Sequence, residues 1–311
     1  MSTPTAPTPR AADEMTPTAP THPRLPPCAA DELLANVACD GGDGDALHRT
    51  FQRHGLVIVR GFLTAAEVAG TLAHIDRVVD ALPGRIASGA VPASHVQYDD
   101  VQVPATLKQI QQLWKKDPFF ERLMARLQAV AEATFGEGAA PQNMQFFSKP
   151  PRSAYAGARL ASSQPTPPHQ DAHYFMLETP ASAATLWVAL DRVDEENGCL
   201  RYLPTQGASA SEQPLRPHDY SGIVGFSQAI TDWGADDERR EVAVRARPGD
   251  LIVHQSLMVH RADANRSDER HRRAVGAIFY ADSHRVDRAR WEARQAEIAT
   301  RAALLEGQDG A

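Results

Sequence analysis

From residue 142 onward the sequence is a series of short apolar runs separated by turns that contain Pro or Gly. The alternation is clearest in residues 184–190, where Thr185 and Trp187 would face one side of a strand and Leu186 and Val188 the other. Asn-Gly at 197–198 and Pro-Gly-Asp at 248–250 are typical of turns between strands. This pattern predicts a β core of the jelly-roll type over about residues 142–284.

The N-terminal half has mainly helical periodicity. Residues 45–54 and 64–82 predict two helices, the second capped by Thr64, and a short β-branched strand is expected between them at 56–60. Residues 107–135 also have helical spacing, with Pro118 expected to begin a second helix. A last helix is expected at about 286–305, where the sequence is rich in Arg, Ala and Glu. The predicted fold class is therefore mainly β with peripheral helices (α+β).

Two segments differ from the rest in composition. Residues 1–29 are rich in Pro, Thr and Ala and too poor in large apolar groups to form a core, so we expect a disordered tail there. We expect residues 30–311 to form one domain, because 42% hydrophobic content is enough for a sizeable core. Residues 206–240 are polar and weakly patterned, and they predict an insertion that is either a lid or a passive surface loop.

Charge and cysteine content exclude several classes of function. The formal charge is 32 minus 39, or -7, with no strongly basic tract, which argues against nucleic acid as a partner. Three widely spaced cysteines argue against a disulfide framework or a zinc site. No apolar run approaches the roughly 20 residues of a membrane span, and the N-terminus lacks the apolar centre of a signal peptide. We expect a cytoplasmic monomer or homodimer without a membrane or nucleic-acid partner.

The triplet His169-Gln170-Asp171 is the strongest chemical signal. Residues two apart in an extended segment point to the same side, so His169 and Asp171 can bind one ion. His260, at the end of an apolar strand expected at 251–259, can complete the site from beside the triplet. Two imidazoles and one carboxylate suit Fe(II) and leave positions open for an organic co-substrate and O2. By itself the triplet is also compatible with a surface loop that has no ligand role.

A basic pair follows His260. Arg272 and Arg273 precede the apolar run 274–280, where a guanidinium can bind a carboxylate through two parallel hydrogen bonds. A dicarboxylate such as 2-oxoglutarate would be held in this way. Arg272 shares strand parity with the small residues Ala274 and Gly276, which favours it as the anchor, and Arg273 is the alternate.

Five ordered blocks of the sequence resemble the phytanoyl-CoA dioxygenase family of Fe(II)- and 2-oxoglutarate-dependent oxygenases. They are His169-Gln170-Asp171, residues 185–190, Asn197-Gly198-Cys199-Leu200, Pro248-Gly249-Asp250 and residues 260–273, and the resemblance covers roughly residues 45–284. It implies a double-stranded β-helix core with helices outside. It also implies Fe(II) on His169, Asp171 and His260, and 2-oxoglutarate held by Arg272 with help from Thr185 or Trp187.

The sequence departs from the family at Pro204-Thr205-Gln206-Gly207, where members usually have Pro-Gly-Ser-His. The carboxylate of Asp171 is retained, whereas relatives that halogenate have a small residue at this position. The resemblance therefore favours oxygen transfer over halogenation.

Three further residues are candidates for substrate binding. Lys149, where the family often has lysine, can pair with an acidic group or be a solvated loop residue. His173 can reach the site by its parity with His169, or serve only as a structural histidine. Gln145 lies on what would be a polar strand face toward the cavity. His254 is expected to fill the barrel.

The function predicted from the sequence is a dioxygenase that couples conversion of 2-oxoglutarate to succinate and CO2 with oxidation, most often hydroxylation, of a small organic substrate. The same site can instead desaturate, epimerise or close a ring. A non-catalytic jelly-roll module that binds 2-oxoglutarate or another metabolite is the alternative from a different class, and a cupin-like metal enzyme that uses no keto acid is another.

Overall fold

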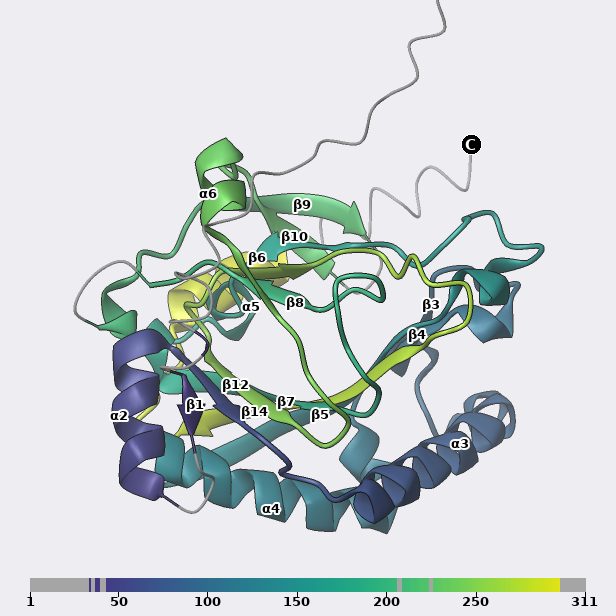
Figure 1. Ribbon diagram of the computed structural model, residues 1–311, viewed down its shortest axis with the longest axis horizontal. Coiled ribbons are helices and arrows are strands. Elements are labelled where there is room, and N and C mark those ends of the chain that lie inside the picture. The colour runs from purple at the N-terminus through teal and green to yellow at the C-terminus, as the bar shows by residue number, and fades with distance from the viewer. Residues whose placement is uncertain (1–33, 35–36, 40–42, 206–208, 224–225, 297–311) are drawn as a thin grey trace, which may run out of the picture.

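The computed structural model describes residues 34, 37–39, 43–205, 209–223 and 226–296 (Figure 1). The predicted tail at 1–29 and the end of the predicted helix at 286–305 lie outside this range. Residues 288–296 are helical, as expected for the part of that helix that is described. Within the described residues no helix combines the length and apolar character needed to cross a membrane.

Two sheets face each other in the centre of the molecule (Figure 1). The large sheet has eight strands in the order β1-β2-β12-β7-β14-β5-β4-β3, and the small one has four in the order β11-β8-β13-β6. In that order the large-sheet strands are β1 (Ala38–Cys39), β2 (Leu56–Val59), β12 (Leu251–Gln255), β7 (Ala183–Ala189), β14 (Arg272–Ala281), β5 (Ala139–Lys149), β4 (Leu107–Ile110) and β3 (Val96–Tyr98). The small-sheet strands are β11 (Val242–Val244), β8 (Leu200–Tyr202), β13 (His260–Ala262) and β6 (Thr166–His169). This arrangement confirms the predicted jelly-roll class with peripheral helices.

Helices α2 (Gly44–His54), α3 (Ala65–Ala87) and α4 (Pro118–Phe135) lie outside the large sheet (Figure 1). As predicted, Thr64 caps α3: its hydroxyl accepts from Glu67 N, and Glu67 Oε2 accepts from Thr64 N at 2.8 Å. Pro118 begins α4, also as predicted.

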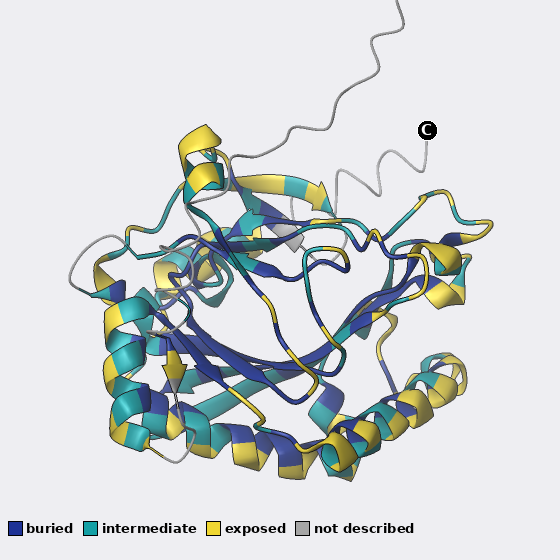
Figure 2. Cartoon of the chain, in the orientation of Figure 1, coloured by how far each residue is buried: buried dark blue, intermediate teal, exposed yellow. Residues whose placement is uncertain are grey.

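The alternation predicted for β7 divides the core into two layers. Leu186 and Val188 belong to the apolar cluster between the large sheet and the helices, whereas Trp187 and Ala189 belong to the cluster between the two sheets. The strands between these layers are almost entirely buried (Figure 2). Functional residues can therefore lie on the inner face of the large sheet, which is the face turned toward the small sheet.

Three expectations were wrong in detail. Residues 107–110 form β4, not helix, because four buried residues pair with β3 and β5, and periodicity alone does not separate a short buried strand from a helical turn. Strand β2 confirms the strand expected at 56–60, whereas β1, β3 and β4, which were not expected, extend the large sheet beyond the predicted core at 142–284. The run 251–259 is not one strand: β12 ends at Gln255, and β13 begins at His260.

The predicted insertion at 206–240 contains regular structure in its described part. A hairpin of β9 (His218–Ile223) and β10 (Phe226–Ile230) is followed by α6 (Ala235–Arg240). The remaining helical segments are η1 (Ala93–His95), η2 (Pro104–Thr106), η3 (Leu113–Lys115), η4 (Arg152–Tyr155), α5 (Ala172–Phe175), η5 (Pro180–Ser182) and η6 (Ala210–Glu212).

Candidate metal centre and adjoining cavity

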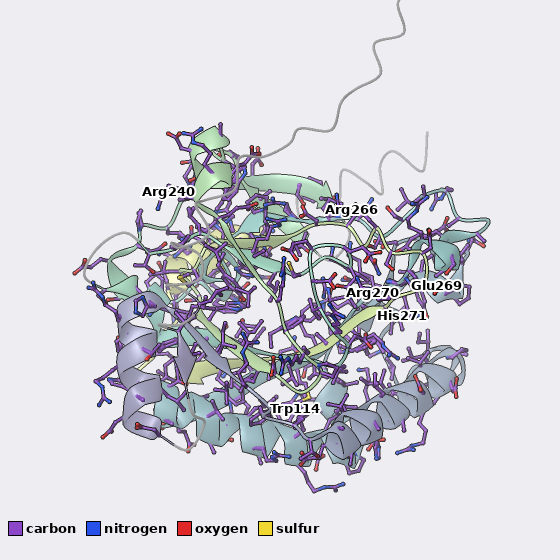
Figure 3. The ribbon with its side chains drawn as sticks, in the orientation of Figure 1. Trp114, Arg240, Arg266, Glu269, Arg270 and His271 are labelled. Carbon is purple, nitrogen blue, oxygen red and sulfur yellow. The ribbon has the colours of Figure 1, made fainter. Side chains whose placement is uncertain are left out.

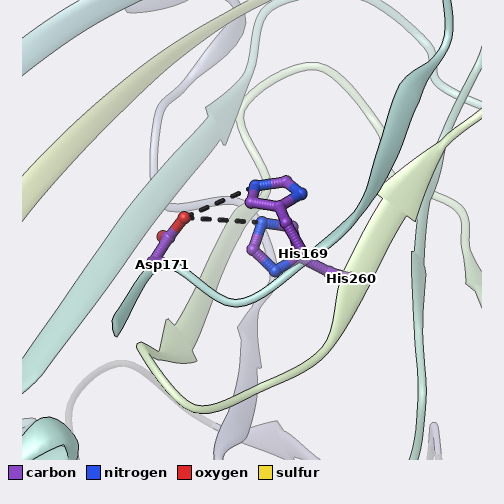
Figure 4. Close-up of side chains that lie close together, drawn as sticks. All are labelled: His169, Asp171 and His260. Carbon is purple, nitrogen blue, oxygen red and sulfur yellow. Dashed lines mark ion pairs between the residues drawn. The ribbon is translucent and has the colours of Figure 1, made fainter. Parts of the chain in front are cut away.

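His169, Asp171 and His260 converge at one end of the small sheet (Figure 4). His169 ends β6 and His260 begins β13, and the two are register partners. Asp171 Oδ1 lies 3.5 Å from His169 Nε2 and 3.8 Å from His260 Nε2. One ligand atom from each residue therefore lies within 4.8 Å of the other two.

The backbone geometry that brings Asp171 to this site differs from the expected one. Strand alternation was the predicted reason for its alignment with His169, but Asp171 lies beyond the end of β6 with φ -58° and ψ -30°, at the start of α5. The strand ends at His169, and the chain turns at once into helical conformation. This turn, and not strand parity, directs the carboxylate back toward the two imidazoles.

Backbone carbonyls set the tautomer of both histidines. His169 Nδ1 lies 2.8 Å from Pro167 O, and His260 Nδ1 lies 3.0 Å from Met258 O. A carbonyl only accepts, so each Nδ1 carries the hydrogen and each Nε2 keeps its lone pair toward the centre. Burial, together with neighbouring His169 and His254, also holds the pKa of His260 well below its usual value. A neutral imidazole is the form that binds a metal.

The second oxygen of Asp171 is held by two protein groups. Thr185 Oγ1 donates to Asp171 Oδ2 at 2.5 Å, and His254 Nε2 lies 3.2 Å from the same atom. Burial alone would raise the pKa of Asp171, but the neighbouring imidazoles of His169, His254 and His260 outweigh it, and the pKa lies well below its usual value. The residue is therefore a carboxylate whose Oδ1 faces the two imidazoles. Two imidazoles and one carboxylate form a donor set that fits Fe(II).

A cavity of about 410 Å³ adjoins the three residues, and Arg272 borders it. Arg272 is 5% exposed, and its Nε has no hydrogen-bond partner among the described residues. Its Cζ lies 5.7 Å from the centre of the Trp187 ring, and burial lowers its pKa to about 10. Because a buried guanidinium without an acidic partner is costly, this group fits a carboxylate ligand in the cavity.

The alternate anchor, Arg273, is already paired. Its Nε and Nη2 bind the two oxygens of Asp191 at 3.0 and 2.7 Å, on the other face of β14. This pairing leaves Arg272 as the arginine available to a ligand.

The loop between β13 and β14 holds Arg272 in place, and Figure 3 labels its residues Arg266, Glu269, Arg270 and His271. Arg270 binds both oxygens of Asp194, at 2.8 and 2.9 Å. Asn197, from the predicted Asn-Gly turn, donates to the carbonyl of His271 at 3.0 Å. These contacts fix the backbone immediately before Arg272, so the turn contributes to the cavity without lining it.

The other residues predicted to bind a co-substrate or substrate lie in different surroundings. Lys149, Gln145, Trp187 and Thr185 all border the cavity. Lys149 is buried beside Arg272 and donates to the carbonyl of Gln164 at 2.7 Å, so it is not the solvated lysine of the alternative interpretation. The hydroxyl of Thr185, assigned to 2-oxoglutarate from the resemblance, is instead bonded to Asp171. His173 does not border the cavity; its ring stacks on His218, with centroids 4.4 Å apart.

Sequence reasoning missed two features of the site. His254 was expected only to fill the barrel, yet it contacts Asp171 and also bonds through Nδ1 to Tyr202 Oη at 2.9 Å. Lys108, paired with Asp99 at 3.1 Å, borders the cavity from β4, a segment predicted to be helical. Only the strand assignment of residues 107–110 would have placed Lys108 there.

Comparison with known proteins is consistent with the geometry. A family model described as Phytanoyl-CoA dioxygenase (PhyH) matches residues 51–274. Peroxisomal phytanoyl-CoA dioxygenase of Bos taurus is 29% identical over 161 residues, which are 50% of this chain and 44% of that protein. The Rattus norvegicus enzyme is 24% identical over 226 residues, 70% of this chain and 62% of that protein. The chain thus spans less than two thirds of the length of either relative.

Solved structures share the fold. The non-heme alpha ketoglutarate dependent epimerase SnoN from nogalamycin biosynthesis is 25% identical with a TM-score of 0.55, covering 83% of this chain and 85% of that one. EctD from S. alaskensis, solved with 2-oxoglutarate and 5-hydroxyectoine, is 17% identical with a TM-score of 0.59, covering 89% and 88%. At 17% identity the second likeness concerns the fold alone.

Proposed function

This chain belongs to the phytanoyl-CoA dioxygenase family, and we propose that it is an Fe(II)- and 2-oxoglutarate-dependent dioxygenase that oxidises a small organic substrate. The proposal depends on the Arg272 guanidinium, which is buried without an acidic partner among the described residues and borders the same cavity as His169, Asp171 and His260. A metal-binding face and a carboxylate anchor are the two requirements of a site that uses a keto acid. The proposal assigns both to one cavity.

In this proposal His169, Asp171 and His260 hold iron, and Arg272 holds the carboxylate of 2-oxoglutarate remote from the metal. Iron, when bound, supplies the chemistry that couples O2 reduction to decarboxylation of the keto acid and oxidation of the substrate. Trp187 limits the movement of the Arg272 guanidinium, and Lys149 lies beside it with a pKa held well below its usual value by burial and by the Arg272 charge. Thr185 and His254 keep Asp171 oriented, so they act as positioning residues.

Hydroxylation is the outcome we propose first. Asp171 occupies the position that is a small residue in halogenating relatives, which supports oxygen transfer. Desaturation, epimerisation or ring closure at the same site would be distinguished by product analysis once a substrate is in hand. The net charge of -7 supports a small-molecule partner over nucleic acid, while a cytoplasmic location and a monomeric or homodimeric state stay predictions.

The test is succinate formation from 2-oxoglutarate by the protein with Fe(II), ascorbate and O2. We expect slow release without substrate in the unaltered protein and none in His169→Ala or His260→Ala. A protein that binds 2-oxoglutarate but releases no succinate, with or without a substrate panel, would support the non-catalytic binding module. Substrate turnover that is independent of 2-oxoglutarate and unchanged in an Arg272→Ala, Arg273→Ala double variant would support a metal enzyme without a keto acid.

A further inference from the structure

Five glutamines border the cavity: Gln97, Gln109, Gln111, Gln145 and Gln164. A cavity wall made of so many side-chain amides is unusual, because ligand cavities are lined predominantly by apolar and aromatic groups with few polar ones. The proposed metal and co-substrate site does not use these amides.

Strand register places three of the glutamines in a row on the inner face of the large sheet. Gln97 of β3 is the register partner of Gln109 of β4, and Gln109 is the partner of Phe147 of β5, two residues from Gln145 on the same face. Gln109 Nε2 donates to Gln145 Oε1 at 2.6 Å. Gln145 is in turn the register partner of Gly276 on β14, whose neighbour on β7 is Trp187. The row therefore runs from the proposed co-substrate site to the β3 edge of the sheet, where β3 and β4 lie in Figure 1.

Three of these amide groups have a side-chain oxygen without a hydrogen-bond partner. Among the described residues, five buried side-chain polar atoms have none, and four of them belong to residues of this cavity: Gln97 Oε1, Gln109 Oε1, Gln164 Oε1 and Arg272 Nε. A buried carbonyl oxygen without a partner destabilises the protein, because its hydrogen bonds to water are lost and not replaced. Because the three glutamines border the cavity, a bound ligand that offers hydroxyl or N–H donors can supply the partners that these oxygens lack. An aliphatic chain supplies none.

Charge narrows the class further. Lys108, Asp99 and Lys149 also border the cavity. Lys108 and Asp99 are paired with each other at 3.1 Å. Burial beside Arg272 holds the pKa of Lys149 well below its usual value. Asp99 also accepts from Tyr155 Oη at 2.6 Å. This part of the cavity is therefore polar but balanced in charge, which does not favour a strongly anionic substrate there.

We infer that the substrate is a compact, uncharged molecule rich in hydroxyl or amide N–H groups, bound along the glutamine row, and not an aliphatic acyl chain. The inference rests on the proposed function, because it assigns the Arg272 part of the cavity to 2-oxoglutarate and the glutamine part to the substrate. It adds Gln97 and Gln109 to the residues that set specificity.

The test measures binding to the protein loaded with Zn(II) and 2-oxoglutarate, which cannot turn over. One probe panel contains methyl pyranosides, cyclitols and amino-acid amides, and the other contains aliphatic alcohols and esters of matched size, with binding detected by saturation-transfer NMR. We expect several-fold more probes of the donor-rich panel than of the aliphatic panel to show binding. The best donor-rich probe should lose about 3- to 10-fold in affinity in Gln97→Leu and in Gln109→Leu, as for the loss of one hydrogen bond. Gln128→Leu, on α4, makes the same chemical change outside the cavity and should leave affinity unchanged.

Equal or better binding of the aliphatic panel would overturn the inference. Equal affinity of the donor-rich probes for Gln97→Leu and for the unaltered protein would also overturn it. If Gln109→Leu fails to fold, Gln97→Leu on the edge strand β3 decides the matter alone. Binding of 2-oxoglutarate is measured first. Its absence from the unaltered protein would count against the proposed function, whereas its presence together with an aliphatic preference would count only against the glutamine row.

Discussion

His254 Nε2 lies 3.2 Å from Asp171 Oδ2, the oxygen of that carboxylate that is turned away from the other two ligands. His254 and Thr185 are register partners on β12 and β7, and both contact this one atom. The large sheet thus holds Asp171, a proposed metal ligand that directly follows β6 of the small sheet. The proposed metal centre therefore depends on the two sheets being packed together.

Replacing His254 by Leu is expected to weaken metal binding. Loss of the contact frees the Asp171 carboxylate to rotate, and loss of such supporting contacts typically lowers metal affinity about 10- to 100-fold. Calorimetric titration with Co(II) or Mn(II) measures the effect. His254→Gln, which can still donate, should recover part of the affinity. The control is His284→Leu, because His284 Nδ1 bonds to the carbonyl of Ala281 and not to a proposed metal ligand. Equal affinity in His254→Leu and the unaltered protein would remove the proposed positioning role.

Arg272→Ala is expected to lower the affinity for 2-oxoglutarate by about 10- to 100-fold, as expected for loss of a hydrogen-bonded charge pair. Arg273→Ala is the matched control, because Arg273 binds Asp191 and not the cavity. It should affect stability more than co-substrate affinity. Titration of the metal-loaded protein with 2-oxoglutarate separates the two, and a larger loss in Arg273→Ala would reverse the assignment.

Low pH is expected to destabilise the fold through His218. Neutral His218 accepts from Gln170 N at 3.1 Å and lies near Arg216, Asp232 and His169, and burial lowers its pKa below 6.5. Because the unfolded chain then binds the proton more readily, this contribution to stability is present above pH about 6.5 and is lost as pH falls through the lowered pKa. Urea unfolding from pH 7.5 to 5 should show a steeper loss for the unaltered protein than for His218→Gln. Parallel profiles would contradict this role.

Gly249→Ala is expected to destabilise the protein by roughly 1–3 kcal/mol or more. Gly249 has φ 90°, and a Cβ there would collide with the carbonyl oxygen of Leu63, whose N–H donates to Gly249 O at 2.9 Å. Gly70→Ala in α3 meets no atom within 4 Å and should stabilise by about 0.5–1 kcal/mol. Thermal unfolding of both variants gives the comparison, and shifts of the same sign would be inconsistent with the strained turn.

The sequence was enough to predict the jelly-roll class, because alternation in β7 and the turns at 197–198 and 248–250 are local signals. The three proposed ligands and the choice of Arg272 over Arg273 also came from spacing and parity. By contrast, the contact of His254 with Asp171 depends on the pairing of β12 with β7, and the glutamine row depends on β3, β4 and β5 lying side by side. Both are products of long-range register, for which a single sequence carries no local signal.

The central claim is that His169, Asp171 and His260 hold iron beside 2-oxoglutarate. The most direct measurement is an anaerobic titration of Fe(II) into the protein with 2-oxoglutarate, followed by visible absorbance. We predict a weak charge-transfer band that saturates at about one iron per chain, is lost in Asp171→Ala and His260→Ala, and needs more 2-oxoglutarate in Arg272→Ala. A correctly folded, unaltered protein that develops no such band at saturating Fe(II) and 2-oxoglutarate would contradict the claim.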